Sequence, residues 1–257
     1  MARKSWVAVL TAVLVLSLAA VGSAQIDVKT QLGYGGTSYG KILDAKNAKT
    51  TEWSAVALGT YAHDDLLFSA SFTSSNSLNV SVTADGEEEP QENSQKGIHR
   101  RSNLQFGANY LFLKDTGLKL YGGLGYSMTW VTLKDQDLRD NTQLSLGGKG
   151  FAGQAIAQFT LGDKFTADAY LSAAPWYSWE YTEKDDSRKN IGGSHYHYQL
   201  GFEYLFAEDY SIRLGMQGGA YSLDKFRFSS SEPEETIELP ETSSSYSGVT
   251  VGVTWHF

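Results

Sequence analysis

The sequence predicts an all-β chain that closes into a ten-stranded antiparallel transmembrane β-barrel, with short turns at one end and longer loops at the other. Three observations lead to this prediction: an export segment begins the chain, short and long polar connections alternate along it, and a strictly alternating strand ends it. Beyond residue 24 no apolar run reaches the length of a membrane-crossing helix. A chain of this kind can cross a bilayer only as a closed barrel, in which every backbone polar group is paired.

The first 24 residues read as a secretory signal peptide. A short basic start, residues 1–4, precedes an apolar stretch at 6–21, and the small residues Gly22, Ser23 and Ala24 precede Gln25. A membrane anchor is the alternative, but the apolar stretch is short for a spanning helix. We therefore divide the chain into a signal peptide, 1–24, and a barrel, 25–257.

Composition narrows the possible partners and chemistry. The chain has 29 acidic and 21 basic residues, for a net charge of −8, which argues against nucleic acid as a partner. It has no cysteine, which excludes disulfides and thiolate metal sites. Its 26 glycines and 15 tyrosines suit an exported all-β chain. No motif for a cofactor is present, and none is expected.

Four short turns alternate with five longer polar stretches, the spacing expected of a transmembrane barrel. The turns lie at 62–65, 114–117, 162–164 and 207–209, and the longer stretches near 40–50, 84–97, 134–142, 183–194 and 229–244. The strands are expected at about 26–39, 51–62, 66–82, 98–113, 118–133, 143–161, 165–182, 195–206, 210–228 and 245–257.

The last strand alternates strictly between two faces. One face carries Val249, Val251, Val253, Trp255 and Phe257, and the other carries glycine, threonine and histidine. This segment resembles the terminal strand of bacterial outer-membrane β-barrel proteins, which typically ends in an aromatic residue. The resemblance implies that Trp255 and Phe257 are the signal read by the barrel-assembly machinery. It also implies an outer-membrane location, contact with outer-membrane lipid, extracellular loops and periplasmic termini.

Alternation also predicts which side chains face lipid in each hairpin, since a one-residue slip would exchange the faces. Pairing Tyr204 with Ile212 and Phe202 with Leu214 gives an apolar outer surface and places Glu203 opposite Arg213. The hairpins at Asp115 and Asp163 give similar apolar faces. In the first hairpin, Val56 and Leu58 are expected to face lipid opposite Phe72 and Ala70, with Trp53 and Tyr61 pointing inward.

Aromatic residues are expected at both membrane interfaces. Trp176, Trp179 and Tyr196 would form the loop-side girdle; the turn-side girdle would comprise Phe165, Phe206, Tyr210, Trp255 and Phe257. The core of a soluble sandwich is the alternative explanation for this aromatic content.

The lumen is expected to be a packed polar core with at most a narrow gap, because small barrels are filled by their own side chains. Inward positions alternate glycines with bulky residues such as Tyr121, Tyr170 and Tyr221. The candidate lumen charges are Lys119, Asp168, Glu203 and Arg213. Glu203 and Arg213 are predicted to form a structural pair, since buried charges must be paired.

Two histidines and several loop acids are candidate functional groups. His195 and His197 share the lumen face near the loop end, but a histidine pair without a third ligand does not define a metal site. The architecture is similar to that of the ten-stranded omptin proteases, which carry an Asp pair and an Asp–His pair at the mouth. Asp85, Asp185 and Asp186 lie in comparable loops, but no histidine matches the omptin pair. We therefore predict no catalytic residue.

The sequence leaves three functional hypotheses. The first is a non-enzymatic surface barrel whose loops meet an unidentified extracellular partner or solute. The second is a surface protease of omptin type, and the third is a small-solute channel. Fold alone does not decide among them.

Overall fold

The computed structural model describes residues 25–43, 46–77, 80–83, 97–135, 143–183, 186–229 and 236–257. The predicted signal peptide lies outside these residues. The strands are β1 (Gln25–Leu43), β2 (Lys46–His63), β3 (Leu66–Ser77), β4 (Val80–Thr83), β5 (Gly97–Asp115), β6 (Leu118–Asp135), β7 (Gln143–Thr160), β8 (Phe165–Ala174), β9 (Ser178–Glu183), β10 (Asp186–Ile191), β11 (Gly193–Ala207), β12 (Tyr210–Leu223), β13 (Phe226–Ser229), β14 (Thr236–Leu239) and β15 (Thr242–His256). No helix within these ranges is long and apolar enough to cross a membrane.

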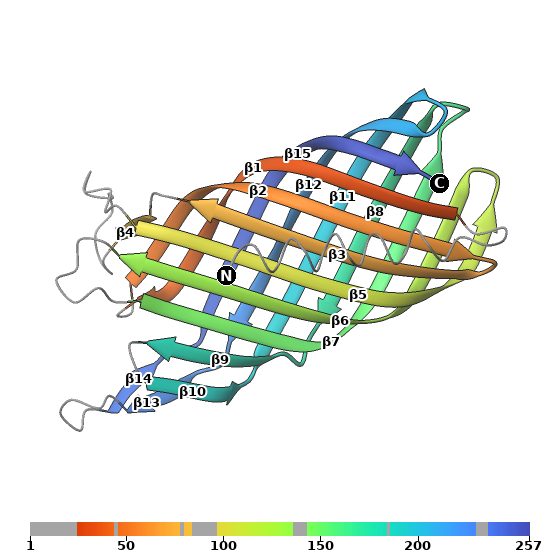
Figure 1. Ribbon diagram of the computed structural model, residues 1–257. Coiled ribbons are helices and arrows are strands. Elements are labelled where there is room, and N and C mark those ends of the chain that lie inside the picture. Colours follow the sequence, from red (N-terminus) through yellow and green to blue (C-terminus); the bar gives the residue numbers. More distant parts are fainter. Residues whose placement is uncertain are drawn as a thin grey trace.

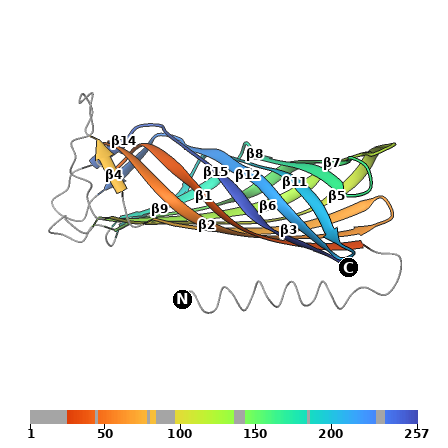
Figure 2. The same cartoon turned by 90° about the horizontal axis from the view of Figure 1, so that it is seen from above.

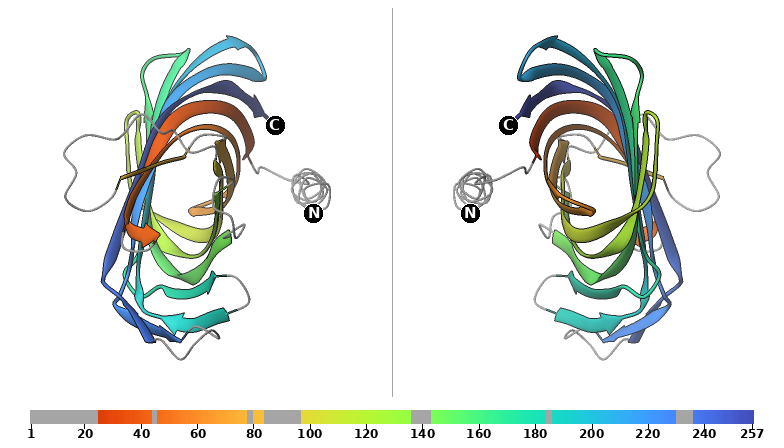
Figure 3. Two further views of the ribbon diagram at one scale, coloured as in Figure 1. Left: turned by 90° about the vertical axis from the view of Figure 1, so that its left-hand side faces the viewer. Right: turned by 90° about the vertical axis from the view of Figure 1, so that its right-hand side faces the viewer.

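These strands form a closed antiparallel barrel, which confirms the predicted fold class (Figure 1). Ten segments make up its wall, each a single strand or two consecutive strands, and we call each segment a stave. Five staves are built from two consecutive strands each: β3–β4, β8–β9, β10–β11, β12–β13 and β14–β15. Neighbouring staves pair in chain order, and β15 pairs with β1 to close the barrel. β13 and β14 pair with each other in a separate two-stranded sheet at the loop end. Figure 3, which looks along the strands, shows the resulting ring of staves.

The terminal strand lies as its alternation predicted. Val249 and Val251 are exposed on the outer wall, whereas Thr250 and Thr254 are buried inside. At the seam, Ile26 and Phe257 exchange two backbone hydrogen bonds, with N···O distances of 3.1 and 2.8 Å. The last strand therefore completes the hydrogen bonding of the first, which is the condition for closing a barrel without free edges.

The first hairpin differs from its predicted register by one residue. Val56 pairs with Thr73 and Leu58 with Ser71, so both aliphatic side chains point inward and are buried. Trp53, which was expected inside, is 68% exposed on the outer wall. The cause is a two-residue turn, in which Asp64 adopts a φ of 52°. A two-residue loop moves the pairing by one position, and aspartate tolerates the left-handed conformation that it needs.

Trp179 also faces the opposite way from its prediction. It is 1% exposed and lies inside the barrel, while Trp176 and Tyr196 are on the outer wall as expected. Between β8 and β9 the pairing with β7 shifts by one residue, because Ala173 pairs with Gly153 but Ser178 pairs with Lys149. Pro175 lies in this break, where it has no N–H to give to the ladder. The extra residue exchanges the inward and outward faces beyond it.

The two halves of the barrel have opposite polarity. In the half next to the turns, large apolar side chains such as Leu124, Phe151 and Val251 are exposed on the outer wall. Its inside is mostly polar, with a smaller apolar cluster of Leu67, Tyr121, Ile156 and Tyr170. In the half next to the loops, the outer wall carries Arg100, Glu180 and several serines, while the inside is apolar. The loop-side half thus resembles a soluble β-structure that prolongs a membrane barrel, and we call this half the loop-side extension. Figure 2 shows the barrel from the side, with the strands running along its length.

Candidate functional site: a lumen filled from end to end

Side chains from opposite walls meet across the lumen. Tyr170 of β8 donates to Gln105 of β5 at 2.8 Å, and Gln217 of β12 donates to Ser54 of β2 at 2.8 Å. Asn103 of β5 donates to the Tyr246 hydroxyl of β15 at 3.2 Å. The strands in each of these pairs are not neighbours in the sheet, so the bonds cross the interior.

A four-residue ion cluster fills the lumen near the turns: Lys29, Asp168, Glu203 and Arg213. The Lys29 Nζ lies 3.0 Å from Asp168 Oδ1 and 2.7 Å from Glu203 Oε1. The Arg213 guanidinium contacts both carboxylates, with Nη2 donating to Asp168 Oδ2 at 2.8 Å and Nη1 to Glu203 Oε1 at 2.5 Å. Two positive and two negative charges therefore cancel, which is what burial requires of charged groups.

A glycine makes room for the arginine of this cluster. A Cβ at Gly201 would overlap the Arg213 guanidinium group. Gly201 neighbours Glu203 along β11 and faces the lumen with it. Gly201 is thus one of the glycines expected at inward positions, and it has a packing role: it leaves space for the planar guanidinium of Arg213.

A second cluster of charged side chains, the Arg101 layer, lies in the lumen between the ion cluster and the loop end of the barrel. Arg101 forms an ion pair with Glu52 and donates to Ser75 Oγ at 3.2 Å. Its guanidinium carbon lies 3.6 Å from the centroid of the Tyr246 ring, a cation–π contact. His99 lies 3.3 Å from Glu52, from Nδ1 to Oε2. All of these side chains except that of Ser75 are bulky, and all are buried, so this layer also obstructs the interior.

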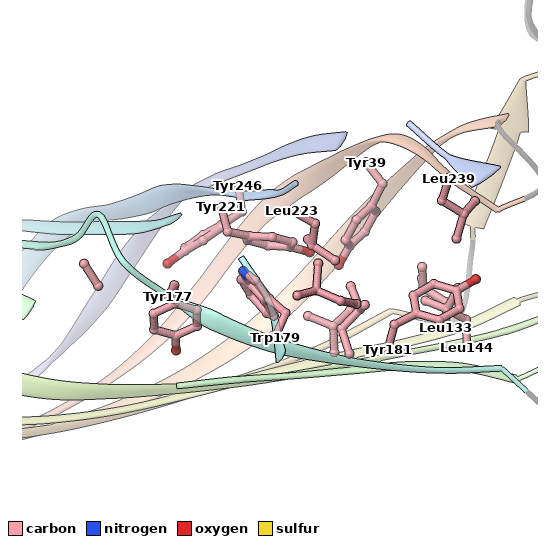
Figure 4. Close-up of a cluster of buried hydrophobic side chains, with 14 of the residues drawn as sticks. Tyr39, Leu133, Leu144, Tyr177, Trp179, Tyr181, Tyr221, Leu223, Leu239 and Tyr246 are labelled. Atoms are coloured by element: carbon pink, nitrogen blue, oxygen red, sulfur yellow. The ribbon is translucent and has the colours of Figure 1, made fainter. Parts of the chain in front are cut away.

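An aromatic plug closes the loop-side half. It consists of Tyr39, Val131, Leu133, Leu144, Leu146, Ala152, Ala174, Tyr177, Trp179, Tyr181, Ile191, Tyr221, Leu223, Leu239 and Tyr246. Figure 4 shows its rings between opposite walls, where the Trp179 and Tyr221 centroids are 5.1 Å apart and those of Tyr177 and Trp179 are 4.9 Å apart. Apolar side chains packed in this way exclude water from the interior.

His195 and His197 point into the lumen, as their parity predicted, and are buried there. His195 Nδ1 lies 3.2 Å from Ser127 Oγ, and His197 Nδ1 lies 2.8 Å from the Tyr246 hydroxyl. The other ring nitrogen of His197 lies 3.0 Å from Gln199 Nε2. The described residues contain no group of three or more His, Cys, Asp or Glu side chains arranged to hold a metal ion.

A hydrogen-bonded chain of Asp27, His256 and Ser211 lies at the turn-side mouth. His256 Nδ1 is 2.8 Å from Asp27 Oδ1, and its Nε2 is 2.8 Å from Ser211 Oγ. The order of the three side chains is that of the Asp-His-Ser triad of serine hydrolases. In such a triad, however, a substrate must be able to reach the serine hydroxyl. Ser211 is only 3% exposed and is enclosed by the wall. We assign the chain to the seam, where it joins β1, β15 and β12.

The other candidate residues lie apart from these groups. Lys119, predicted as a lumen charge, is exposed beside the turn that follows β5, because it is the second residue of its strand. Asp85 and Asp185 lie outside the described residues. Asp186 begins β10 in the loop-side extension.

Sequence reasoning missed Lys29, Glu52, His99 and Arg101. A usable signal was present for two of them. Leu104 and Phe106 belong to the apolar face predicted for the hairpin at Asp115, so the same alternation points the polar side chains of the other face inward: His99, Arg101, Asn103 and Gln105. Polar residues at every second position of one strand therefore marked the upper charged layer.

Comparisons with known proteins agree with this architecture. No protein-family model matches the chain, and no curated protein matches its sequence. Among solved structures, the outer-membrane protease OmpT from Escherichia coli aligns with a TM-score of 0.60 and 9% identity, over 93% of this chain and 99% of that one. The translocator domain of the autotransporter NalP from Neisseria meningitidis gives a TM-score of 0.46 and 13% identity, over 100% and 96% of the two chains. The chain therefore has the fold of bacterial outer-membrane β-barrel proteins, a likeness of architecture and not of motif.

Proposed function

We propose that the protein is a closed, non-enzymatic barrel of the bacterial outer membrane that displays its loop-side extension and loops on the cell surface for contact with a partner. The observation that carries this proposal is the filled lumen. The ion cluster, the Arg101 layer and the aromatic plug succeed one another along the axis, and each is built from buried side chains. A solute passing through would have to break buried ion pairs and displace a packed apolar core.

The change of polarity supports the proposed orientation. The apolar outer wall matches a bilayer, and the polar outer wall with an apolar inside matches an aqueous surrounding on the loop side. Such an extension holds the loops at a distance from the membrane on a rigid base. We place it outside the cell, with both chain ends on the periplasmic side.

Planar-bilayer recording of the refolded protein tests closure. We expect no stepwise conductance from protein whose insertion is verified by heat-modifiable migration, while a general porin added to the same membranes gives steps. Reproducible unitary steps from the protein alone would support the channel hypothesis instead.

Epitope insertion tests orientation. A tag placed within 84–96 should bind antibody on intact cells, whereas a tag between Thr116 and Gly117 should bind only after the outer membrane is permeabilised. The reverse pattern would contradict the proposed display function.

Peptide cleavage tests the remaining hypothesis. Incubation with dibasic peptides should leave them intact. Cleavage of these peptides, if abolished by Asp185→Ala or Asp186→Ala, would contradict the proposed display function and support the omptin-like protease hypothesis instead.

A further inference from the structure

The outer wall carries a groove where its surface changes from apolar to polar. This rim groove has a volume of about 640 Å³ and crosses β2, β1, β15, β12 and β11. Its lining residues are Gly36, Thr37, Ser38, Lys49, Thr50, Thr51, Tyr198, Gly219, Ser245, Tyr246 and Ser247. Ser38, Ser245 and Ser247 are exposed, so hydroxyl groups form much of its floor.

Long and aromatic side chains border this floor of small residues. The exposed Lys49 lies at one edge. Tyr198 lies at the other, and its hydroxyl would be 2.5 Å from a Cβ added at Gly218. On the turn side of the groove, the Tyr34 and Trp53 rings contact each other with centroids 4.9 Å apart and planes tilted by 57°, and both are exposed. The groove is therefore bounded by a cation and by aromatic rings.

The height of the rim groove matches the edge of a bilayer. Gly36 follows the first residue of β1, Gln25, by eleven positions. At roughly 2.5 Å of rise per residue along the membrane normal, this distance is about 27 Å, close to the apolar band of outer-membrane barrels. Tyr34 and Trp53 then lie where interfacial aromatic residues are found, and the hydroxyl floor lies at headgroup level.

A second groove meets the rim groove at Tyr198. This wall groove, of about 460 Å³, lies over β6, β7, β8 and β11 and is lined by Gly123, Gly153, Gln154, Ala155, Leu171, Ser172, Ala173, Tyr196, His197 and Tyr198. Nothing lies within 4 Å of a Cβ added at Gly153. Small outward residues thus leave a hollow in the lipid-facing wall, beside Phe151, which is 78% exposed. The hollow is mainly apolar and suits a hydrocarbon chain.

We propose that the two grooves together bind one lipid of the loop-side leaflet, whose headgroup carries a phosphate and free hydroxyls. The Lys49 ammonium would attract the phosphate, and the serine and threonine hydroxyls would hydrogen-bond the headgroup oxygens. One acyl chain would lie in the wall groove. This inference rests on the insertion proposed above, but not on whether the lumen conducts.

Native mass spectrometry of the folded protein tests the site, with phosphatidylglycerol as the anionic probe and phosphatidylcholine as the zwitterionic one. We expect tighter binding of phosphatidylglycerol, and a loss of about fivefold in its affinity on Lys49→Gln, from the contribution of one lysine near a charged headgroup. Lys149→Gln, at an exposed lysine outside both grooves, is the matched control and should change nothing.

Filling the wall groove tests the acyl half of the proposal. Gly153→Leu should weaken the binding of both lipids. Gly147→Leu should weaken neither, since it lies outside the wall groove at an outer-wall glycine where an added Cβ would meet only Trp130 Cδ1, at 4.0 Å. Heat-modifiable migration verifies that every variant is folded. Equal binding of the two lipids by the unaltered protein, or equal effects of the two glycine variants, would overturn the proposal.

Discussion

The ion cluster near the turns allows a quantitative test of the lumen. Glu203→Gln removes a carboxylate that has Lys29 at 2.7 Å and Arg213 at 2.5 Å, and it leaves the cluster with one excess positive charge. Arg213→Met leaves one excess negative charge in the same place. Breaking a buried pair costs about 3–5 kcal/mol, because the remaining charge is desolvated without compensation. We expect each single variant to lose about 3 kcal/mol of unfolding free energy, toward the lower end of that range, because the other two charges stay.

The double variant restores neutrality. Lys29 and Asp168 remain 3.0 Å apart and still form an ion pair after both substitutions. The double variant should therefore be less damaged than the sum of the singles, with a coupling energy of about 2 kcal/mol, within the range for residues in contact.

The unaltered protein, the two single variants and the double variant form a double-mutant cycle. Urea unfolding in lipid vesicles, followed by tryptophan fluorescence, measures the unfolding free energy of all four proteins. Lys119→Met is the control, since this lysine is exposed and its loss should cost less than about 0.5 kcal/mol. Additive single effects would refute the reasoning, because they would mean that the two charges do not meet in the lumen.

Three further predictions address the outer wall, the seam and the plug. Leu124→Arg places a charge on the lipid face, where Leu124 is 73% exposed, and should cost about 2–4 kcal/mol in vesicle refolding titrations; a neutral result would mean that this face does not meet lipid. Deleting Trp255 to Phe257 removes the seam hydrogen bonds of Phe257 and the expected assembly signal, so membrane fractions should lack heat-modifiable protein. Normal levels after that deletion would show the terminal residues to be dispensable. Trp179→Ala empties the centre of the plug and should cost about 3–5 kcal/mol by denaturant unfolding, whereas Trp176→Ala, on the exposed outer wall, should cost far less. Equal losses would contradict the inward position of Trp179.

The sequence alone determined the number of staves and most of their faces. Side chains alternate with a period of two, so a segment such as Val249 to Phe257 reveals both faces without any knowledge of its neighbours. The same holds for the hairpin that places Glu203 opposite Arg213, since one short turn fixes its register.

The tertiary structure decided three things that the alternation of side chains does not encode: the register of some strands, the partners across the lumen and the polarity of the inner face. A two-residue turn at Asp64 and a bulge at Pro175 each moved the pairing by one residue, and this exchanged the faces of Val56 and Trp179. Closure brought Lys29 of β1 to Asp168 of β8, a contact across the lumen between residues 139 positions apart. Alternation divides the side chains of a strand into two faces, but turns and bulges in the backbone decide which of these faces points into the lumen. Barrel closure sets the partner, and height relative to the bilayer decides whether the inner face is polar or apolar.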